Sequence, residues 1–497
     1  MEFVKKNIIG ISLIFIIVPI IIFLFGFLKI YWAILFSIII LLCYYKIWNN
    51  EKIIDNNIKF TKIELIVSVI IILIWLFFSG IGNFSYQNTD WDVRNAVFRD
   101  LIEYEWPVIF STGEIEHATE DVLHTDKIGF VYYFTYWLPA ALIGKIFGLT
   151  IANIFLYIWT FVIIMLILYL LKVYLKKNTY LILYFLIFFS GMDILAIINK
   201  SDIFGIEHLE WWSIIMQYSS NTTLLYWVFN QSIISWLITI LILIVKKESS
   251  ILFIAPLLFA YSPFATIGII PIVGYLIIKK IFMEKDKKNK IIKLIFSTEM
   301  LNILLILLVF GTYYLSADSS ISKRGFILNL ISMKMSVFII LYFIFILVEV
   351  FIYFLFIIKS KKYNDGLFKI ICIELILIPF YKMTPSNDFC MRVSIVPLFI
   401  LMIYFIRYVS EIKKQEKITK IFVILIVLIS IVTPLHEISR SFYFTLSNNE
   451  DNIKDKKIYS IGNPKTKAGF RLCNEQFYNK NLGKEFFSKY LLKEYNK

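Results

Sequence analysis

The sequence predicts an all-α polytopic membrane protein with about thirteen transmembrane helices and a helical loop on the outer face of the membrane. Three observations support this fold class. Of the 497 residues, 59% are hydrophobic and the mean hydropathy is +0.77, whereas soluble domains are about 45–50% apolar. Apolar runs near the length of a spanning helix recur, without the short alternating segments of a β-barrel. Lysines gather between these runs, as topology requires.

Each of eleven apolar runs is expected to form one helix across the hydrocarbon core, which needs roughly 20 residues. These runs are residues 8–28, 30–47, 63–83, 151–171, 179–198, 223–245, 292–315, 333–358, 367–382, 392–409 and 419–436. Two further stretches are ambiguous. Residues 127–148 are long enough to cross, and residues 251–280 are too long for one span and are interrupted at Pro263.

The lysine-rich turns resolve both ambiguities, because cytoplasmic loops are enriched in Lys and Arg. They lie at residues 46–62, 172–177, 246–247, 279–293, 359–362 and 413–420. All can be cytoplasmic only if residues 127–148 form an interfacial or re-entrant helix on the outer side, and residues 251–262 and 264–280 form a half-length hairpin. We therefore expect a multi-pass plasma-membrane protein with a cytoplasmic amino terminus and an extracytoplasmic carboxyl terminus.

This topology divides the chain into three parts. Residues 1–62 form a transmembrane hairpin and a cytoplasmic loop, residues 63–436 form a transmembrane core, and residues 437–497 form a small extracytoplasmic cap. The outer loops of the core are residues 84–150, 199–222 and 383–391.

The first outer loop is unusually acidic. Between residues 84 and 128 there are ten Asp or Glu side chains against three Lys or Arg. A helix that begins near Thr89 would place Asp92 on one face with Arg99 and leave a separate apolar stripe. A carboxylate at the membrane boundary can act as a general base, which makes Asp90 and Asp92 the candidate catalytic residues, with Arg94 and Arg99 beside the substrate. Alternatively, Asp90 is only the N-cap and Asp92 and Arg99 form a structural ion pair.

Aromatic residues near the outer face could hold a sugar. The stretch YYFTYW begins with Tyr132 and Tyr133, and the second outer loop carries His208 and Glu210 before two tryptophans. Sugar rings present apolar C–H faces that suit aromatic platforms. The alternative for the tryptophans is an interfacial aromatic belt.

A third group of polar residues opens the span after residue 391. Asn387, Asp388 and Arg392 approach the membrane from the outside. A partly buried guanidinium at a helix start suits a phosphate or diphosphate group. The alternative is an ion pair between Arg392 and Asp388 within the loop.

Several classes of function are excluded or disfavoured. The net charge of +14 reflects lysines between apolar runs, so we do not expect nucleic-acid binding. The four cysteines form no CxxC pair, and His208 with Glu210 lacks further ligands, so no metal site is predicted. No cofactor is identified, although a requirement for a divalent cation stays open.

The acid-bearing helix after an early span, the aromatic segment that ends in LPAALIGKIFG, and the split hairpin resemble the GT-C glycosyltransferases over roughly residues 60–450. The resemblance implies a GT-C-like catalytic core, a polyprenyl-phosphate sugar donor, and a catalytic Asp at position 90 or 92. The chain departs from the family pattern by its extra pair of spans before the catalytic loop. It also lacks the Asp often found where the span after the second outer loop begins, here NTTLLYWVFNQ, which leaves Glu210 or His208 as a substitute.

The sequence therefore predicts a glycosyltransferase that moves a sugar from a membrane polyprenyl-phosphate carrier to an extracytoplasmic glycan, lipid or protein. One alternative is a polysaccharide polymerase or ligase of the O-antigen type, although such proteins usually place paired arginines in a large late loop. Another is a polytopic transporter or flippase, for which Glu349 and Glu374 are intramembrane candidates but no internal repeat is visible.

Overall fold

The protein is described from a computed structural model. The structure describes residues 6–53, 60–111, 127–197, 208–317, 324–331, 333–360, 362–383, 388–413, 415–447, 458–461, 477–479 and 481–495.

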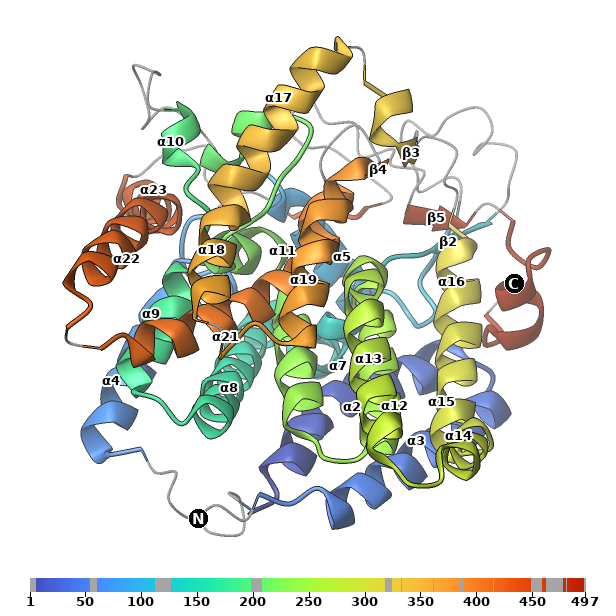
Figure 1. The fold of residues 1–497 in the computed structure, drawn as a ribbon. Helices are drawn as coiled ribbons and strands as arrows, with labels where there is room; N and C mark the ends of the chain where they lie inside the picture. Colours follow the sequence, from blue (N-terminus) through green and yellow to red (C-terminus); the bar gives the residue numbers. More distant parts are fainter. Residues whose placement is uncertain are drawn as a thin grey trace.

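Helices dominate these residues (Figure 1). The first half contains α2 (Ile8–Phe27), α3 (Ile30–Asn50), α4 (Lys62–Phe77), α5 (Trp91–Glu103), α7 (Leu138–Phe147), α8 (Leu149–Leu175), α9 (Thr179–Phe188), α10 (Ile194–Ile197), α11 (Asn221–Ile244) and α12 (Glu248–Ile254). The second half contains α13 (Pro263–Met283), α14 (Lys287–Ile295), α15 (Thr298–Ile306), α16 (Thr312–Leu315), α17 (Met335–Ile346), α18 (Ile352–Lys359), α19 (Gly366–Leu377), α20 (Asp388–Val393), α21 (Ile395–Glu411), α22 (Lys417–Ser430) and α23 (Val432–Leu446).

Short 3₁₀ and π-helical segments link several of these helices. They are the 3₁₀ segments η2 (Thr135–Trp137), η3 (Leu209–Ser213), η4 (Ala255–Ala260), η6 (Ile327–Asn329) and η8 (Ile378–Phe380), and the π segments η5 (Leu307–Gly311), η7 (Leu347–Phe351) and η11 (Phe487–Leu491). The π segments η5 and η7 join their flanking helices into the continuous stretches Thr298–Leu315 and Met335–Lys359.

The chain is a polytopic helical membrane protein. Within the described ranges, eight helical stretches are at least 18 residues long and apolar enough to cross a membrane, and two shorter apolar helices accompany them. The predicted count of about thirteen is not confirmed, because several apolar runs give helices shorter than a full span. Helix α4, for example, is 16 residues long, and α19 is 12 residues long.

The fold is mostly rather than entirely helical, because five short strands form two small antiparallel sheets among the described residues. The first has the order β1 (Ile109–Ser111), β2 (Lys127–Phe130) and β5 (Tyr478–Asn479), and the second pairs β3 (Arg324–Phe326) with β4 (Tyr381–Met383). In the first sheet Gly129 is paired with both Ile109 and Asn479. The carboxyl-terminal part of the chain is therefore attached to the first predicted outer loop.

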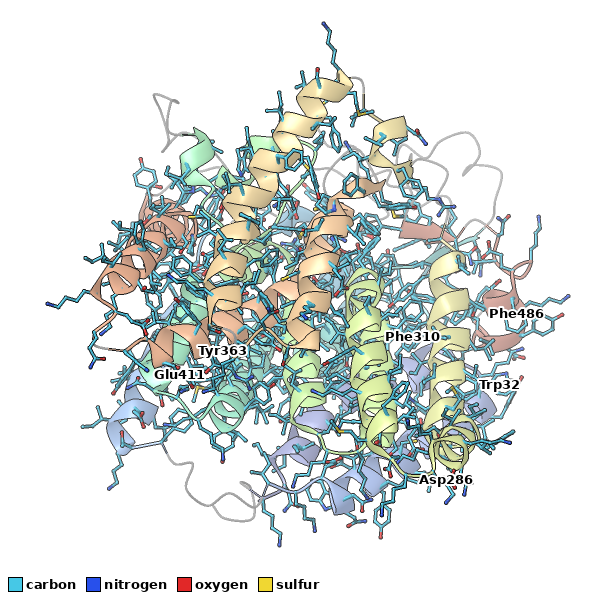
Figure 2. All side chains as sticks on the ribbon, viewed as in Figure 1. Trp32, Asp286, Phe310, Tyr363, Glu411 and Phe486 are labelled. Carbon is cyan, nitrogen blue, oxygen red and sulfur yellow. The ribbon has the colours of Figure 1, made fainter. Side chains whose placement is uncertain are left out.

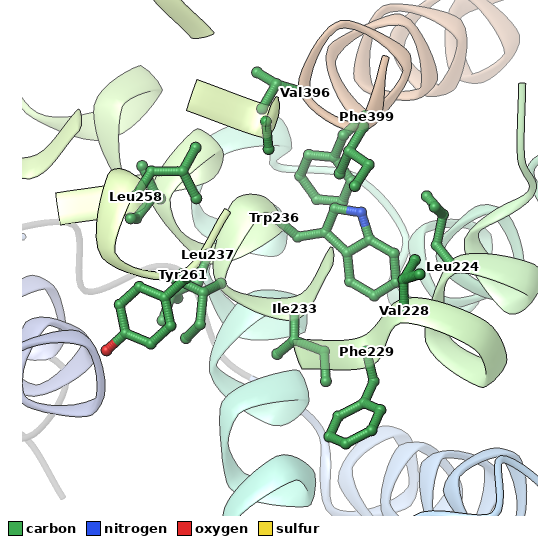
Figure 3. Packing of buried hydrophobic residues seen from close by; sticks show 14 of the residues in the cluster. Leu224, Val228, Phe229, Ile233, Trp236, Leu237, Leu258, Tyr261, Val396 and Phe399 are labelled. Carbon is green, nitrogen blue, oxygen red and sulfur yellow. The ribbon is translucent and has the colours of Figure 1, made fainter. Parts of the chain in front are cut away.

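The core surrounds α11, which lies near the centre of the bundle (Figure 1) and is buried over most of its length. Its Trp236 stacks on Phe399 of α21 with ring centroids 6.0 Å apart, and both side chains are fully buried (Figure 3). The helix is kinked at Val228, whose φ of −142° and ψ of 38° are not helical. Helix α11 contacts several of the surrounding helices, among them α8, α21 and α23.

The ambiguous stretch 251–280 breaks where the sequence predicted. Pro263 is the first residue of α13, and the Ser262 side chain accepts a hydrogen bond from the Ala265 backbone N–H as its N-cap. The arm before the break is short, as expected, but α13 continues for 21 residues and is a full-length candidate span. The predicted half-length second arm was therefore wrong.

Ion pairs join residues in and beside the predicted cytoplasmic turns into two groups. The Glu411 carboxylate pairs with Lys177 at 3.1 Å and with Lys362 at 2.6 Å, which joins three of these turns beside Tyr363 (Figure 2). In the other group, Lys290 pairs with Glu248 at 3.1 Å. Helix α14 lies toward the lower edge of Figure 1, whereas the two small sheets lie in its upper half.

The carboxyl-terminal residues pack against the amino-terminal hairpin. The Lys29 N–H donates to the Leu491 carbonyl and the Lys493 N–H donates to the Phe27 carbonyl, both at 2.9 Å. Helix α23 runs to Leu446, past the boundary at residue 437 that hydropathy suggested for the cap.

Candidate functional site

The predicted surface helix of the first loop is α5, and it begins with a charged pair. Asp90 is at the N-cap position, yet its side chain makes no capping hydrogen bond. Instead, its Oδ2 accepts a 2.8 Å hydrogen bond from Nη2 of Arg94, one turn later. The Asp90 side chain is 51% exposed and that of Arg94 is 7% exposed. This arrangement fixes an accessible carboxylate in one orientation against a buried cation.

Packing holds this end of α5 in place. Trp91 stacks on Phe229 of α11 at 5.3 Å and with 11° between the rings, next to the α11 kink. The Arg94 guanidinium lies 5.7 Å from the centre of the same tryptophan ring. Val97 and Leu101 are fully buried, which confirms the core of the apolar stripe predicted for this helix.

The other predicted charged residues of the loop occupy different positions. Asp92 is half-buried on the first turn of α5. Arg99 pairs with Asp100 at 2.9 Å and with Glu103. Asp100 also accepts hydrogen bonds from Ser460 and the Ile461 N–H, and burial raises its pKa to about 6. Arg99 therefore belongs to a contact between α5 and the carboxyl-terminal part of the chain.

Tyr132 and Tyr133 lie between the first loop and α20. Their ring centroids are 4.2 Å apart, and the Tyr133 hydroxyl accepts a hydrogen bond from Nη1 of Arg392. Burial raises the pKa of Tyr132 well above its usual value and Tyr133 raises it further, whereas Arg392 and Arg94 oppose this shift. The charges of both arginines therefore act on the Tyr132 hydroxyl.

Arg392 is held by α20 and by aromatic rings. Its Nη2 pairs with Asp388 at 3.1 Å, which is the intra-loop ion pair considered as an alternative above. The guanidinium also lies 5.6 Å from the ring of Tyr133 and 5.9 Å from that of Phe264. Asn387, predicted beside it, falls outside the described residues.

The Asp90–Arg94 pair thus lies near the contacts that Tyr132, Tyr133, Asp388 and Arg392 make with one another, and we name the two groups together the arginine–tyrosine cluster. It consists of Asp90, Arg94, Tyr132, Tyr133, Asp388 and Arg392. Within the described chain, Nη1 of Arg94 and Nε of Arg392 are buried and have no hydrogen-bond partner. Unsatisfied guanidinium N–H groups favour an anionic ligand such as phosphate.

His208 and Glu210 belong to a different, buried network. Glu210 accepts hydrogen bonds from the Ser220 N–H at 2.8 Å and from Thr223 at 2.6 Å, so it satisfies donors at the start of α11. Burial and the nearby Asp193 raise the pKa of Glu210 to about 8. Among the described residues, none of the hydrogen-bond or ion-pair partners of Glu210 and His208 belongs to the arginine–tyrosine cluster.

The surroundings of His208 keep its ring neutral near pH 7. Burial, with the positive charge of Arg440 and then His436, lowers the pKa of His208 to about 3. The ring stacks on Trp227 at 5.0 Å, and its Nδ1 lies 3.4 Å from Oε1 of Glu437.

Sequence reasoning missed the α23 residues of this network. Trp227 Nε1 donates to Glu437 at 3.1 Å, across 210 positions in the sequence. The available signal was an acid and an arginine three residues apart, Glu437 and Arg440, directly after an apolar run. These residues were instead assigned to the start of a cap.

Metal-binding groups and cavities among the described residues also bear on the position of the site. In the part of the chain that the structure describes, no group of three His, Cys, Asp or Glu residues is arranged to hold a metal ion. A small, mostly apolar cavity lies under the carboxyl-terminal segment, between Phe27, Pro107, Tyr313 and Leu492. Its lining lacks ionisable side chains other than the Tyr313 phenol, so we place the candidate site at the arginine–tyrosine cluster. No protein-family model, curated protein or solved structure matches the chain.

Proposed function

We propose that the protein is a membrane glycosyltransferase that uses a polyprenyl-phosphate-linked sugar and an extracytoplasmic acceptor. The observation that carries this proposal is the arginine–tyrosine cluster. It combines an accessible carboxylate, two buried guanidinium groups and two tyrosine rings, contributed by three separate segments. These are the groups needed to take a proton, bind a phosphate and position a sugar.

In the proposed reaction, Asp90 takes the proton of the acceptor hydroxyl as its oxygen attacks the anomeric carbon of the sugar. The bond between that carbon and the phosphate oxygen breaks, and the polyprenyl phosphate leaves with the bonding electrons. Attack from the face opposite the leaving group inverts the anomeric configuration. Arg392 and Arg94 stabilise the phosphate charge, and Tyr132 and Tyr133 contact the sugar.

The order of elements around the cluster also supports the resemblance to GT-C glycosyltransferases. Helix α5 follows shortly after α4, and the short α7 packs beside α5 before α8 begins. The alternative catalytic position is Asp92, which lies on the same turn of α5.

The proposal is tested with purified protein, a polyprenyl-phosphate sugar and candidate acceptors, by measuring the release of polyprenyl phosphate. In this assay we expect Arg392→Lys to raise the KM for the donor about 10- to 100-fold, the effect of losing a charge-assisted hydrogen bond of about 1.5–3 kcal/mol. A lysine supplies a point charge but not the planar set of donors.

Arg407→Lys is the matched control, because Arg407 lies near the end of α21, over the ring of Tyr174, and Tyr174 belongs to a predicted cytoplasmic turn. It should leave the donor KM unchanged. Equal effects of the two substitutions would contradict a phosphate-binding role for Arg392.

The membrane orientation gives a second prediction. In intact cells, single cysteines at the exposed Asp90 and half-buried Asp388 should react with an impermeant thiol reagent, in a background without the native cysteines. Cysteines at Lys176 and Asp286, in the lysine-rich turns, should react only after the membrane is permeabilised. Labelling of position 176 or 286 from outside would reject the proposed topology.

A transporter is the second candidate, because two carboxyl groups, those of Asp193 and Glu349, face each other in the interior. Buried acids in a membrane protein often mark ion or proton pathways. Uptake or flipping of a lipid-linked sugar by vesicles containing the protein, without release of polyprenyl phosphate, would favour this candidate over the transferase.

A further inference from the structure

The long helical stretch Met335–Lys359 contains a π segment, η7, with Glu349 in its middle. A π segment widens a helix locally, and such segments often occur at functional sites. Here the Val348 carbonyl accepts a 3.1 Å hydrogen bond from the Met192 N–H, which comes from a segment more than 150 positions earlier. The wide turn therefore holds a second backbone segment against Glu349.

This second segment approaches so closely that it requires glycine. A Cβ added to Gly191 would lie 1.9 Å from Oε2 of Glu349 and 3.2 Å from its Cα. The carbonyl of the preceding residue, Ser190, accepts a 2.6 Å hydrogen bond from the Tyr353 hydroxyl of the same long helical stretch. The contact is therefore tightly packed rather than loosely apposed.

Two acidic side chains meet in this contact. Asp193 is fully buried, Glu349 is 3% exposed, and their carboxyl groups share one hydrogen-bond donor. Trp212 Nε1 donates to both, at 3.1 Å to Asp193 and 3.3 Å to Glu349. Among the described residues, no Lys, Arg or His side chain forms an ion pair with either carboxyl group.

The distribution of donors between the two carboxyl groups is unequal. Thr433 of α23 donates to Asp193 at 2.8 Å, in addition to Trp212, whereas Oε2 of Glu349 is buried without a hydrogen-bond partner. An ionised carboxylate with a buried, unpaired oxygen is costly, whereas a neutral carboxyl group is tolerated. These donors favour the negative charge on Asp193 and a proton on Glu349.

We propose that Asp193 and Glu349 form a proton-binding site that holds one proton between the two carboxyl groups in the folded protein. Two adjacent buried carboxyl groups cannot both ionise without a nearby cation. This site is independent of glycosyl transfer and would exist whether or not the proposed enzyme activity is correct.

The other groups that face the pair do not supply the missing positive charge. They are the carboxyl group of Glu210, the phenols of Tyr353 and Tyr218, the thiol of Cys390, and the hydroxyls of Ser190 and Thr433. Arg440 contacts Glu437 at 3.6 Å and forms no ion pair with Asp193 or Glu349. The groups named here are therefore neutral or negative, which favours retention of the proton.

The test is the pH dependence of thermal unfolding of the full chain in detergent. Unfolded carboxyl groups, with pKa values of about 4, release the proton that the folded pair retains. The proton therefore stabilises the folded state fully at low pH, and this stabilisation is lost progressively as the pH rises from about 4 to the value at which the folded pair ionises. Within that window the unfolding equilibrium constant attributable to the pair should rise about tenfold per pH unit, and above it the constant should no longer depend on pH through the pair.

Asp193→Asn and Glu349→Gln are the informative variants, because each amide can donate to the remaining carboxylate and abolish the need for the proton. We expect each to flatten the fall in melting temperature as the pH rises above about 4, and the double variant to flatten it no further. Glu374→Gln, at another buried glutamate, on α19, is the control and should add to Glu349→Gln. Wild-type pH dependence in both single variants, or additive effects in the double variant, would overturn the proposal.

Infrared spectroscopy of the wild-type protein provides a readout that does not depend on the folding of any variant. A carbonyl stretching band of a protonated carboxyl group should be present at pH 7 and disappear at alkaline pH, and Glu349→Gln should remove it. Persistence of every such band in Glu349→Gln would show that the proton is elsewhere.

Discussion

Replacement of Asp90 by asparagine is expected to lower the rate of sugar transfer by about 10²–10⁴, the usual contribution of a general base. Asparagine has nearly the size of aspartate and can still accept a hydrogen bond from Arg94, but it cannot take a proton at neutral pH. The ion pair with Arg94 is half exposed, so its loss should lower the free energy of unfolding by at most about 1 kcal/mol. Turnover should therefore fall while the melting temperature stays nearly constant.

Two further variants make this experiment discriminating. Asp286→Asn changes an exposed aspartate that caps α14 in a predicted cytoplasmic turn, and it should keep full activity because asparagine also caps helices well (Figure 2). Asp92→Asn tests the neighbouring acid on the first turn of α5. If Asp92→Asn is the inactive variant, the base is Asp92. If both Asp90→Asn and Asp92→Asn retain wild-type turnover, the catalytic interpretation of this loop is wrong.

The sequence predicts helices well where a single apolar run is bounded by polar residues. The run at 8–28 corresponds to α2 and the run at 223–245 to α11, because burial of an apolar helix is decided largely by local composition. The helix predicted at 63–83 ends earlier than expected. Helix α4 ends at Phe77, and Gly80 and Gly82 then adopt φ values of 81° and 88°, which lie outside helical space.

The candidate site could be predicted only in part. Each polar segment stood out by itself, so Asp90, Tyr133 and Arg392 were identified as candidates before their proximity was known. The pairing of Arg99 was predicted wrongly, since it contacts Asp100 and Glu103 rather than Asp92. Contacts between residues that are hundreds of positions apart leave no local pattern in the sequence from which they could be predicted.

Gly268→Ala is expected to have the second large effect, because it disturbs the support of Arg392 without touching the cluster. Gly268 lies on α13, and a Cβ there would be 2.1 Å from the carbonyl oxygen of Val393 and 3.1 Å from its carbonyl carbon. Both are backbone atoms of the residue directly after Arg392. Relief of this clash requires α20 to move away from α13, at a cost of about 1–3 kcal/mol in stability.

A displacement of about 1 Å in a positioning group can lower a reaction rate by about 10²-fold. We therefore expect Gly268→Ala to lower both the melting temperature and the transfer rate, with an increased KM for the donor. Gly274→Ala provides the control on the same helix, because a Cβ there meets nothing within 4 Å. Alanine at that position should be neutral or should stabilise the protein by up to about 1 kcal/mol, since it favours the helix over glycine. If Gly268→Ala behaves like Gly274→Ala in both melting temperature and donor KM, the close contact between α13 and α20 does not position Arg392.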